Sequence, residues 1–369
     1  MALINFNNEQ KLIENEIRKF AQNELEPLSA EIDKEGVFPA ELIKKLFDLG
    51  FFNPSIPEKY GGAGLDATSL CIILEELSRV CASIGTIIVA NNCLVSYPLM
   101  KYAPLEKKEH YLGRLGRGEI GAYSTLPQFD SENNEMELKK ANESVVIRGK
   151  RSFVLNGEAG DIFVLPFSSA EKISLCIFNK TDGVELNKQN ILGLRAAGIT
   201  TFETAGIELS LTDCVCCDVT VEDFFKEVQA FASIGFSAVL LGIAEAAYDN
   251  SVKYSKERKQ FKRAICEFPM VQQMLVDMKT RITALRLMVY EAAKKFDCGE
   301  PYVMAAYLAR LYAGEAAVFA GTNSIQIHGG YGYTKDYPVE RFLRDAKSLQ
   351  VLELLPMEAV TRSVKEILA

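Results

Sequence analysis

The spacing of hydrophobic residues changes twice along the chain, and this change restricts the possible folds more than any other feature. Apolar side chains recur every three or four residues up to about residue 117 and again from about residue 224, as in amphipathic helices. Between these parts lie short runs of β-branched and aromatic residues, at 145–147, 151–155, 162–165, 173–178 and 204–211. We therefore predict a mainly helical α+β protein with an N-terminal helical domain (1–117), a middle antiparallel β domain (118–223) and a C-terminal four-helix bundle (224–369).

Capping residues and prolines indicate where several helices begin. Asn8 is expected to cap a first helix whose apolar face includes Ile13 and Ile17. Pro39 and Pro269 suit the first turn of two further helices, because proline is tolerated there. Helices are also expected at 68–80, 86–102 and 302–327.

Composition excludes some classes of protein. The 369 residues carry a formal net charge of −8, so nothing suggests a general nucleic-acid-binding protein. No apolar run reaches the roughly 18–20 residues needed to span a bilayer, and we expect no membrane insertion. The first six residues lack a basic segment followed by an apolar one, so we expect no signal peptide and a cytoplasmic location by default.

The nine cysteines are scattered and odd in number, which favours reduced thiols over a disulfide framework. Cys214 and Cys217 have half the spacing of a zinc site, but no second pair follows. His110 and His328, the only histidines, lie far away in the sequence. We interpret the cysteine cluster as thiols on a strand or turn and predict no metal site.

Two segments could carry chemistry, and each also has a purely structural interpretation. Gly329, Gly330 and Gly332 follow a long predicted helix, where backbone could approach a pyrophosphate or simply end the helix. Residues 257–263 join basic side chains to Phe261, which suits a phosphate and a ring but also a solvated helix end. The residues alone leave both interpretations open.

Four segments in this order and spacing resemble the acyl-CoA dehydrogenase family: 56–64 (IPEKYGGAG), 257–261 (ERKQF), 326–333 (QIHGGYGY) and 337–347 (YPVERFLRDAK). The resemblance covers nearly the whole chain and implies the same α–β–α fold, with FAD as cofactor and a tetramer that holds FAD partly across a subunit boundary. It also implies oxidoreductase chemistry on an acyl thioester, as in fatty acid metabolism. In that reaction a glutamate takes the α-proton while the β-hydrogen leaves as hydride to the flavin. The partners implied are an acyl-CoA or acyl-carrier-protein substrate and electron-transfer flavoprotein.

The resemblance also assigns roles to individual positions. It places the catalytic base on Glu353. The positions that it implies for FAD binding are Ser124, Thr125, Ser131, Phe153, Leu155, Arg258, Phe261, Gln326, Gly329 and Gly330. Of these, Arg258 and Phe261 match positions that hold the FAD of a neighbouring subunit.

The sequence departs from the family pattern near the implied active site. The tryptophan and threonine that lie against the flavin become Phe153 and Leu155, and leucine cannot donate the threonine hydrogen bond. An aspartate–arginine pair becomes Ala230 and Ser233, and the glycine after the base becomes Leu354. The family's T-E-P-x-A-G-S-D segment also loses an acid and two small residues over 125–132.

These departures leave three accounts open. The chain could be an FAD-dependent dehydrogenase or reductase of an unusual acyl thioester. It could instead be a degenerate subunit that completes an active partner, or a flavin- or acyl-CoA-binding protein without turnover. The sequence does not decide the acyl chain, the choice between CoA and carrier protein, the direction of reaction or the electron acceptor.

Overall fold

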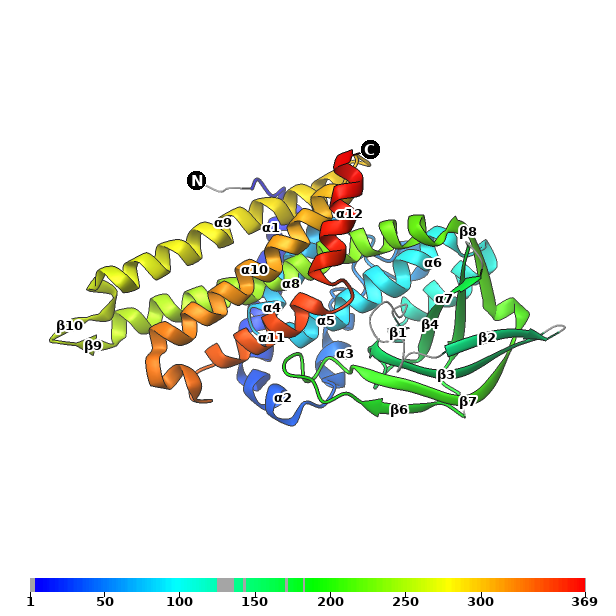
Figure 1. Cartoon of the computed structure of the whole chain (residues 1–369), viewed down its shortest axis with the longest axis horizontal. Coiled ribbons are helices and arrows are strands. Elements are labelled where there is room, and N and C mark those ends of the chain that lie inside the picture. Colours follow the sequence, from blue (N-terminus) through cyan, green and yellow to red (C-terminus); the bar gives the residue numbers. More distant parts are fainter. Residues whose placement is uncertain (1–3, 125–135, 142–143, 170–171, 182, 369) are drawn as a thin grey trace.

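Two helical parts lie beside a sheet, which forms one end of the molecule, in the computed structural model of the chain (Figure 1). The structure describes residues 4–124, 136–141, 144–169, 172–181 and 183–368. The N-terminal helices are α1 (Asn8–Phe20), α2 (Ser29–Glu35), α3 (Ala40–Asp48), α4 (Ala67–Ser78), α5 (Ala82–Val89), α6 (Tyr97–Tyr102) and α7 (Leu105–Leu115). This arrangement confirms the predicted mainly helical α+β fold.

Local hydrogen bonds correct two predicted helix starts. Asn7, not Asn8, caps α1: its side chain accepts from the Gln10 amide, and the Gln10 side chain accepts from the Asn7 amide. The helix predicted at 86–102 begins at Ala82 and continues through a π-helical segment, Ala90–Ser96, into α6. The buried side chain of Asn92 donates to the Phe52 and Ile88 carbonyls within this segment.

The middle of the chain forms one sheet in the order β6–β7–β3–β1–β4–β5–β8, with β2 on β3. Its strands are β1 (Gly121–Ser124), β2 (Met136–Ala141), β3 (Ser144–Leu155), β4 (Ile162–Ser169), β5 (Lys172–Asn179), β6 (Glu185–Lys188), β7 (Thr200–Ser210) and β8 (Cys214–Thr220). The predicted antiparallel pairing needs one correction, because β1 runs parallel to β4. A strand inserted between two oppositely directed neighbours, β3 and β4, must be parallel to one of them.

The C-terminal part packs α8 (Val221–Glu257), α9 (Pro269–Asp297), α10 (Val303–His328) and α11 (Val339–Val351) together, with α12 (Pro356–Leu368) against α10. A hairpin of β9 (Lys259–Gln260) and β10 (Arg263–Ala264) joins α8 to α9 and projects from the end of the bundle away from the sheet (Figure 1). Its two turn residues, Phe261 and Lys262, both have positive φ, as a tight hairpin turn requires.

Among the residues that the structure describes, three helices are long and apolar enough, by length and composition, to cross a membrane: Ala82–Tyr102, Val221–Glu257 and Val303–Tyr333. A helix can reach this hydropathy with scattered polar residues, which a search for uninterrupted apolar runs does not detect. The absence of membrane insertion stays a prediction. Of their most apolar windows, the first is 89% and the second 100% buried inside the protein, while the third is 50% buried. Packing within the fold accounts for the apolar character of the first two helices.

Candidate active site

Glu353 occupies a tight turn between α11 and α12. The Leu354 amide donates to the Leu352 carbonyl at 2.8 Å, which closes a three-residue γ-turn around Glu353. Glu353 has a φ of 66°, a conformation that costs a non-glycine residue about 1–3 kcal/mol and is maintained by its surroundings. Leu354 lies outside the left-handed region, so replacing the family's glycine at this position imposes no torsional strain.

The Glu353 carboxylate is buried, and neither of its oxygens has a hydrogen-bond partner among the described residues. Burial raises the pKa of Glu353 well above its ordinary value, and the nearby Glu358 carboxylate raises it further. The positive charges of Arg310 and Arg362 oppose this shift only in part. A buried carboxyl without donors is a stronger base than a solvated one once it has lost its proton.

Arg310 on α10 holds the loop that carries Glu353. Its guanidinium is buried and donates to the carbonyls of Leu349 at 2.5 Å and Leu352 at 3.1 Å. Leu349 lies in the last turn of α11, and Leu352 is the C-cap of that helix and the first residue of the γ-turn. Burial lowers the pKa of Arg310 to about 10, so it stays cationic at neutral pH. The resemblance did not point to this residue, and its distance of 43 positions from Glu353 gives no sequence signal.

Three of the predicted flavin positions, Ser124, Phe153 and Leu155, lie together at the C-terminal ends of β1 and β3. Tyr123 and Ser124 of β1 pair with Leu155 and Val154 of β3. Leu155 is buried, whereas Phe153 has a φ of 57° and is 44% exposed. The Tyr123 hydroxyl is buried without a partner among the described residues, and burial followed by the Glu353 charge raises its pKa. The charge of Glu353 thus reaches the strand pair that carries the predicted flavin positions.

Two further predicted positions, Thr125 and Ser131, lie outside the described residues. Ala230 and Ser233 are both buried on α8. The Ser233 carbonyl accepts from the Ser237 hydroxyl at 2.6 Å, within the helix. The face of α8 that would carry the family's charged pair therefore carries no charge at these two positions.

The other predicted positions gather at the far end of the bundle. Arg258, Gly329 and Gly330 line a surface pocket of about 460 Å³, and Gln326 is exposed on the last turn of α10. Phe261 is 87% exposed on the hairpin turn. In Figure 1 this hairpin lies at the far end of the helical bundle, well away from β1 and β3, so one chain does not bring the two groups together.

His328 belongs to this second group, although the family resemblance did not point to it. Its Nδ1 lies 2.8 Å from the Ser324 carbonyl oxygen and therefore carries the proton of that bond. Its ring stacks on Tyr254 with centroids 4.2 Å apart, and burial lowers its pKa. Its Nε2 is buried without a partner among the described residues. The neutral ring fixes the end of α10 directly before Gly329.

The zinc interpretation of the cysteine cluster does not fit the strand on which it lies. Cys214 and Cys217 stand three residues apart on β8, and successive side chains of a strand alternate between faces. Cys217 packs in the large core and Cys214 against the smaller one, so the two thiols point to opposite sides of the sheet. In the part of the chain that the structure describes, no group of three potential metal ligands occurs.

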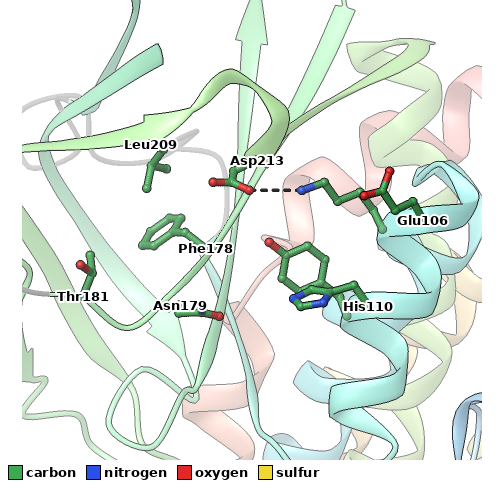
Figure 2. A pocket seen from close by; sticks show the side chains of 9 residues that line it. Glu106, His110, Phe178, Asn179, Thr181, Leu209 and Asp213 are labelled. Atoms are coloured by element: carbon green, nitrogen blue, oxygen red, sulfur yellow. Dashed lines mark hydrogen bonds and ion pairs between the residues drawn. The ribbon is translucent and has the colours of Figure 1, made fainter. Parts of the chain in front are cut away.

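A separate pocket of about 540 Å³ lies between α7 and the sheet (Figure 2). Lys107 and Asp213 form an ion pair of 3.2 Å across it, and His110 and Phe178 line its sides. The predicted flavin positions and Glu353 are not among its lining residues. This pocket is distinct from both groups described above.

Comparison with known proteins gives the family. Residues 7–119 match the acyl-CoA dehydrogenase N-terminal domain, and residues 230–353 match the C-terminal domain. The chain is 37% identical to a short-chain-specific acyl-CoA dehydrogenase of Clostridium acetobutylicum, with 95% of each chain covered. It is 35% identical to an acryloyl-CoA reductase (NADH) of Anaerotignum propionicum, with 94% of this chain and 91% of the relative covered.

A solved structure agrees with this assignment. Butyryl-CoA dehydrogenase from Megasphaera elsdenii superposes with a TM-score of 0.92 at 28% identity, covering 99% of this chain and all of that one. Its likeness extends over the N-terminal helices, the central sheet and the C-terminal helical domain. This chain belongs to the acyl-CoA dehydrogenase family, which is FAD-dependent, and is an acyl-CoA dehydrogenase-like oxidoreductase acting on CH–CH groups.

Proposed function

We propose that this protein catalyses FAD-dependent α,β-dehydrogenation of an acyl thioester, or the reverse reduction, with Glu353 as the base for the α-proton. The observation that carries the proposal is the buried carboxylate of Glu353 on a strained γ-turn, without a hydrogen-bond partner among the described residues. A carboxyl kept in this state for structural reasons alone would be destabilising, because burial disfavours its charged form. Such strain and burial are typical of catalytic residues.

The chain's own residues support proton transfer at Glu353 Oε1 or Oε2. The Arg310 guanidinium fixes the end of α11 and so limits where the γ-turn can place the carboxylate. Burial keeps water from solvating the charged form, which strengthens the base. Bound FAD would supply the hydride acceptor, or the donor in the reductive direction.

The residues at the end of α10 fit a large phosphate-containing cofactor. A methyl group added at Gly329 or Gly330 would meet no atom within 4 Å, so space is open beside this backbone. Arg258 lines the same pocket and offers a cation for a phosphate. Ser124, Phe153 and Leu155 would hold the flavin end. Because the two groups lie well apart in one chain, a second subunit would have to bring them together, and we propose a dimer or tetramer.

Alanine at Gly330 is expected to lower FAD affinity without destabilising the fold. The added methyl group has no neighbour to strike within the chain, but it would occupy the space through which a pyrophosphate approaches the backbone. Alanine at Gly329, where φ is 59°, should in contrast cost about 1–2 kcal/mol of unfolding free energy. FAD titration and thermal unfolding of the apoprotein, measured on both variants, separate the two effects. Unchanged FAD affinity in Gly330→Ala would remove this glycine from the cofactor site.

The substrate and partners follow from the family. We propose an acyl-CoA or acyl-carrier-protein thioester as substrate and electron-transfer flavoprotein as a possible electron partner. The reductase among the relatives supports keeping both reaction directions open. Neutral positions at Ala230 and Ser233 suit a substrate that does not require the family's charged pair. A cytoplasmic location remains a prediction from the sequence.

The absorption spectrum of the protein purified alone tests the proposal. Flavin bands corresponding to about one FAD per chain, bleached by an acyl thioester under anaerobic conditions, are the expected result. The second candidate, a degenerate subunit, predicts a colourless protein that cannot be reloaded with FAD until a partner chain is added. Bound FAD that no saturated or unsaturated thioester reduces or reoxidises would instead support a binding protein without turnover.

A further inference from the structure

Two thiols face each other across neighbouring strands on the outer side of the sheet. Cys176 of β5 is the direct partner of Cys214 on β8, the edge strand of the antiparallel pair. Both side chains pack in or against the smaller hydrophobic cluster, so they lie on the same face. The Cys214 side chain lies close enough to raise the pKa of the Cys176 thiol. The two thiols are therefore neighbours on one face of the sheet in the reduced protein.

The backbone geometry of this pair suits a disulfide. Directly opposed residues of an antiparallel ladder have Cα atoms about 4.5 or 5.5 Å apart, depending on the hydrogen-bonding phase. Disulfides span Cα separations of about 4.4–6.8 Å. Either phase of the ladder falls within this range, so closing the bond needs side-chain rotation and little movement of the strands.

The two thiols differ in access and in charge environment. Cys176 is fully buried, whereas Cys214 is partly exposed at the start of the edge strand. The hydrogen bond to Cys214, followed by burial, raises the pKa of Cys176, which keeps its proton. Cys214 is therefore the thiol of the pair that a solvent-borne oxidant can reach. Cys214 is the reachable nucleophile, and Cys176 is placed to resolve it.

A buried cation acts on Cys176 from the same sheet. Arg151 of β3 is 2% exposed, and its Nε and Nη1 atoms are buried without hydrogen-bond partners among the described residues. Its guanidinium stacks 4.4 Å from the Phe167 ring centre and acts electrostatically on Cys176. A buried guanidinium favours negative charge on neighbouring sulfur, which is the usual setting of reactive cysteines.

We propose that Cys176 and Cys214 form a reversible intramolecular disulfide when the protein meets a hydroperoxide. The Cys214 thiolate attacks the peroxide oxygen, which gives a sulfenic acid and releases water or an alcohol. The Cys176 thiol then attacks the Cys214 sulfur, the S–S bond forms, and the sulfenic oxygen leaves as water. Two thiols lose two electrons and two protons, and the peroxide is reduced by two electrons. A dithiol reductant restores both thiols by exchange.

Mass spectrometry of the peroxide-treated protein tests this assignment. The purified full-length chain is exposed to hydrogen peroxide, its remaining thiols are alkylated under denaturing conditions, and the digest is mapped. We expect a linked pair of peptides containing Cys176 and Cys214, lost after dithiothreitol treatment. The cross-link should also raise the unfolding temperature of the oxidised protein, because it closes a loop within the sheet.

Variants assign the roles within the pair. Cys214→Ser should leave Cys176 fully alkylatable after peroxide, whereas Cys176→Ala should leave Cys214 as a sulfenic acid that dimedone captures. Cys298→Ser, which removes an exposed cysteine at the C-terminal end of α9, is the matched control and should not change the cross-link yield. Full alkylation of Cys176 in oxidised wild-type protein, or a link from Cys214 to Cys216 or Cys217, would overturn the proposal. The wild-type digest decides this even if a variant fails to fold.

Discussion

Glutamine at Glu353 is expected to lower kcat/KM for the thioester substrate by about 10²–10⁴-fold, because the amide cannot accept the α-proton. The fold should survive, since the amide has nearly the same shape and carries no charge to bury. The folded-state pKa of Glu353 is raised, so the folded protein binds its proton more tightly and the carboxyl costs stability as pH rises above its unfolded-state pKa. The variant should therefore match or exceed the wild type in unfolding free energy at pH 8. Steady-state kinetics and denaturant unfolding measure the two effects.

Glu358→Gln is the matched control for this substitution. Glu358 is the neighbouring carboxyl on α12, accepts from the Leu355 amide at 3.2 Å and raises the pKa of Glu353 through its charge. Its removal should leave the plateau of kcat/KM near the wild-type value. It should also move the acid limb of the pH profile to lower pH, because Glu353 then ionises more easily. Equal losses in both glutamine variants would contradict the assignment of the base to Glu353.

Periodicity identified most long elements because their buried faces repeat regularly. The predicted start of a helix near Pro269 and the helix at 302–327 are confirmed by α9 and α10. Strand β8 was not predicted as a separate element, because its cysteines do not have a strong β signal. The predicted cap, Asn8, is one residue away from the observed cap, Asn7. Two adjacent asparagines have equal capping chemistry, and the reciprocal bond with Gln10 selects Asn7.

The site was less predictable because its geometry depends on long-range contacts. The resemblance gave Glu353, but the γ-turn that buries it depends on Arg310 of α10, which binds the carbonyls before it. Residue patterns could not show that Tyr123 lies near the base, since β1 reaches it only through the order of the sheet. The two segments that carry Arg258 and Phe153 likewise do not show in their sequences that the fold places them far apart.

Arg286→Ala should destabilise the fold by about 3–5 kcal/mol, the usual cost of leaving a buried charge unpaired. Arg286 of α9 donates to both carboxylate oxygens of Glu75, at 3.0 Å for one of them, and to Glu245 of α8 at 2.9 Å. Glu75 is 2% exposed and also accepts from the Tyr290 hydroxyl at 2.8 Å. The ion pair thus ties α4 to the C-terminal helices at a buried point. Urea unfolding at several pH values measures the loss.

The pH dependence and a second substitution distinguish this loss from general damage to the helix. Burial is the main cause that raises the pKa of Glu75, and Arg286 opposes it, so removing the arginine raises that pKa further. The loss of unfolding free energy in Arg286→Ala, relative to the wild type, should therefore grow as pH rises from 5 to 8. Glu75→Gln in the same background should recover part of it, because the amide carries no charge. Lys19→Ala, which breaks the exposed 2.8 Å pair with Glu16, should cost less than about 1 kcal/mol at either pH. An Arg286→Ala deficit as small as that control, or one independent of pH, would show that the buried pair does not hold the two parts together.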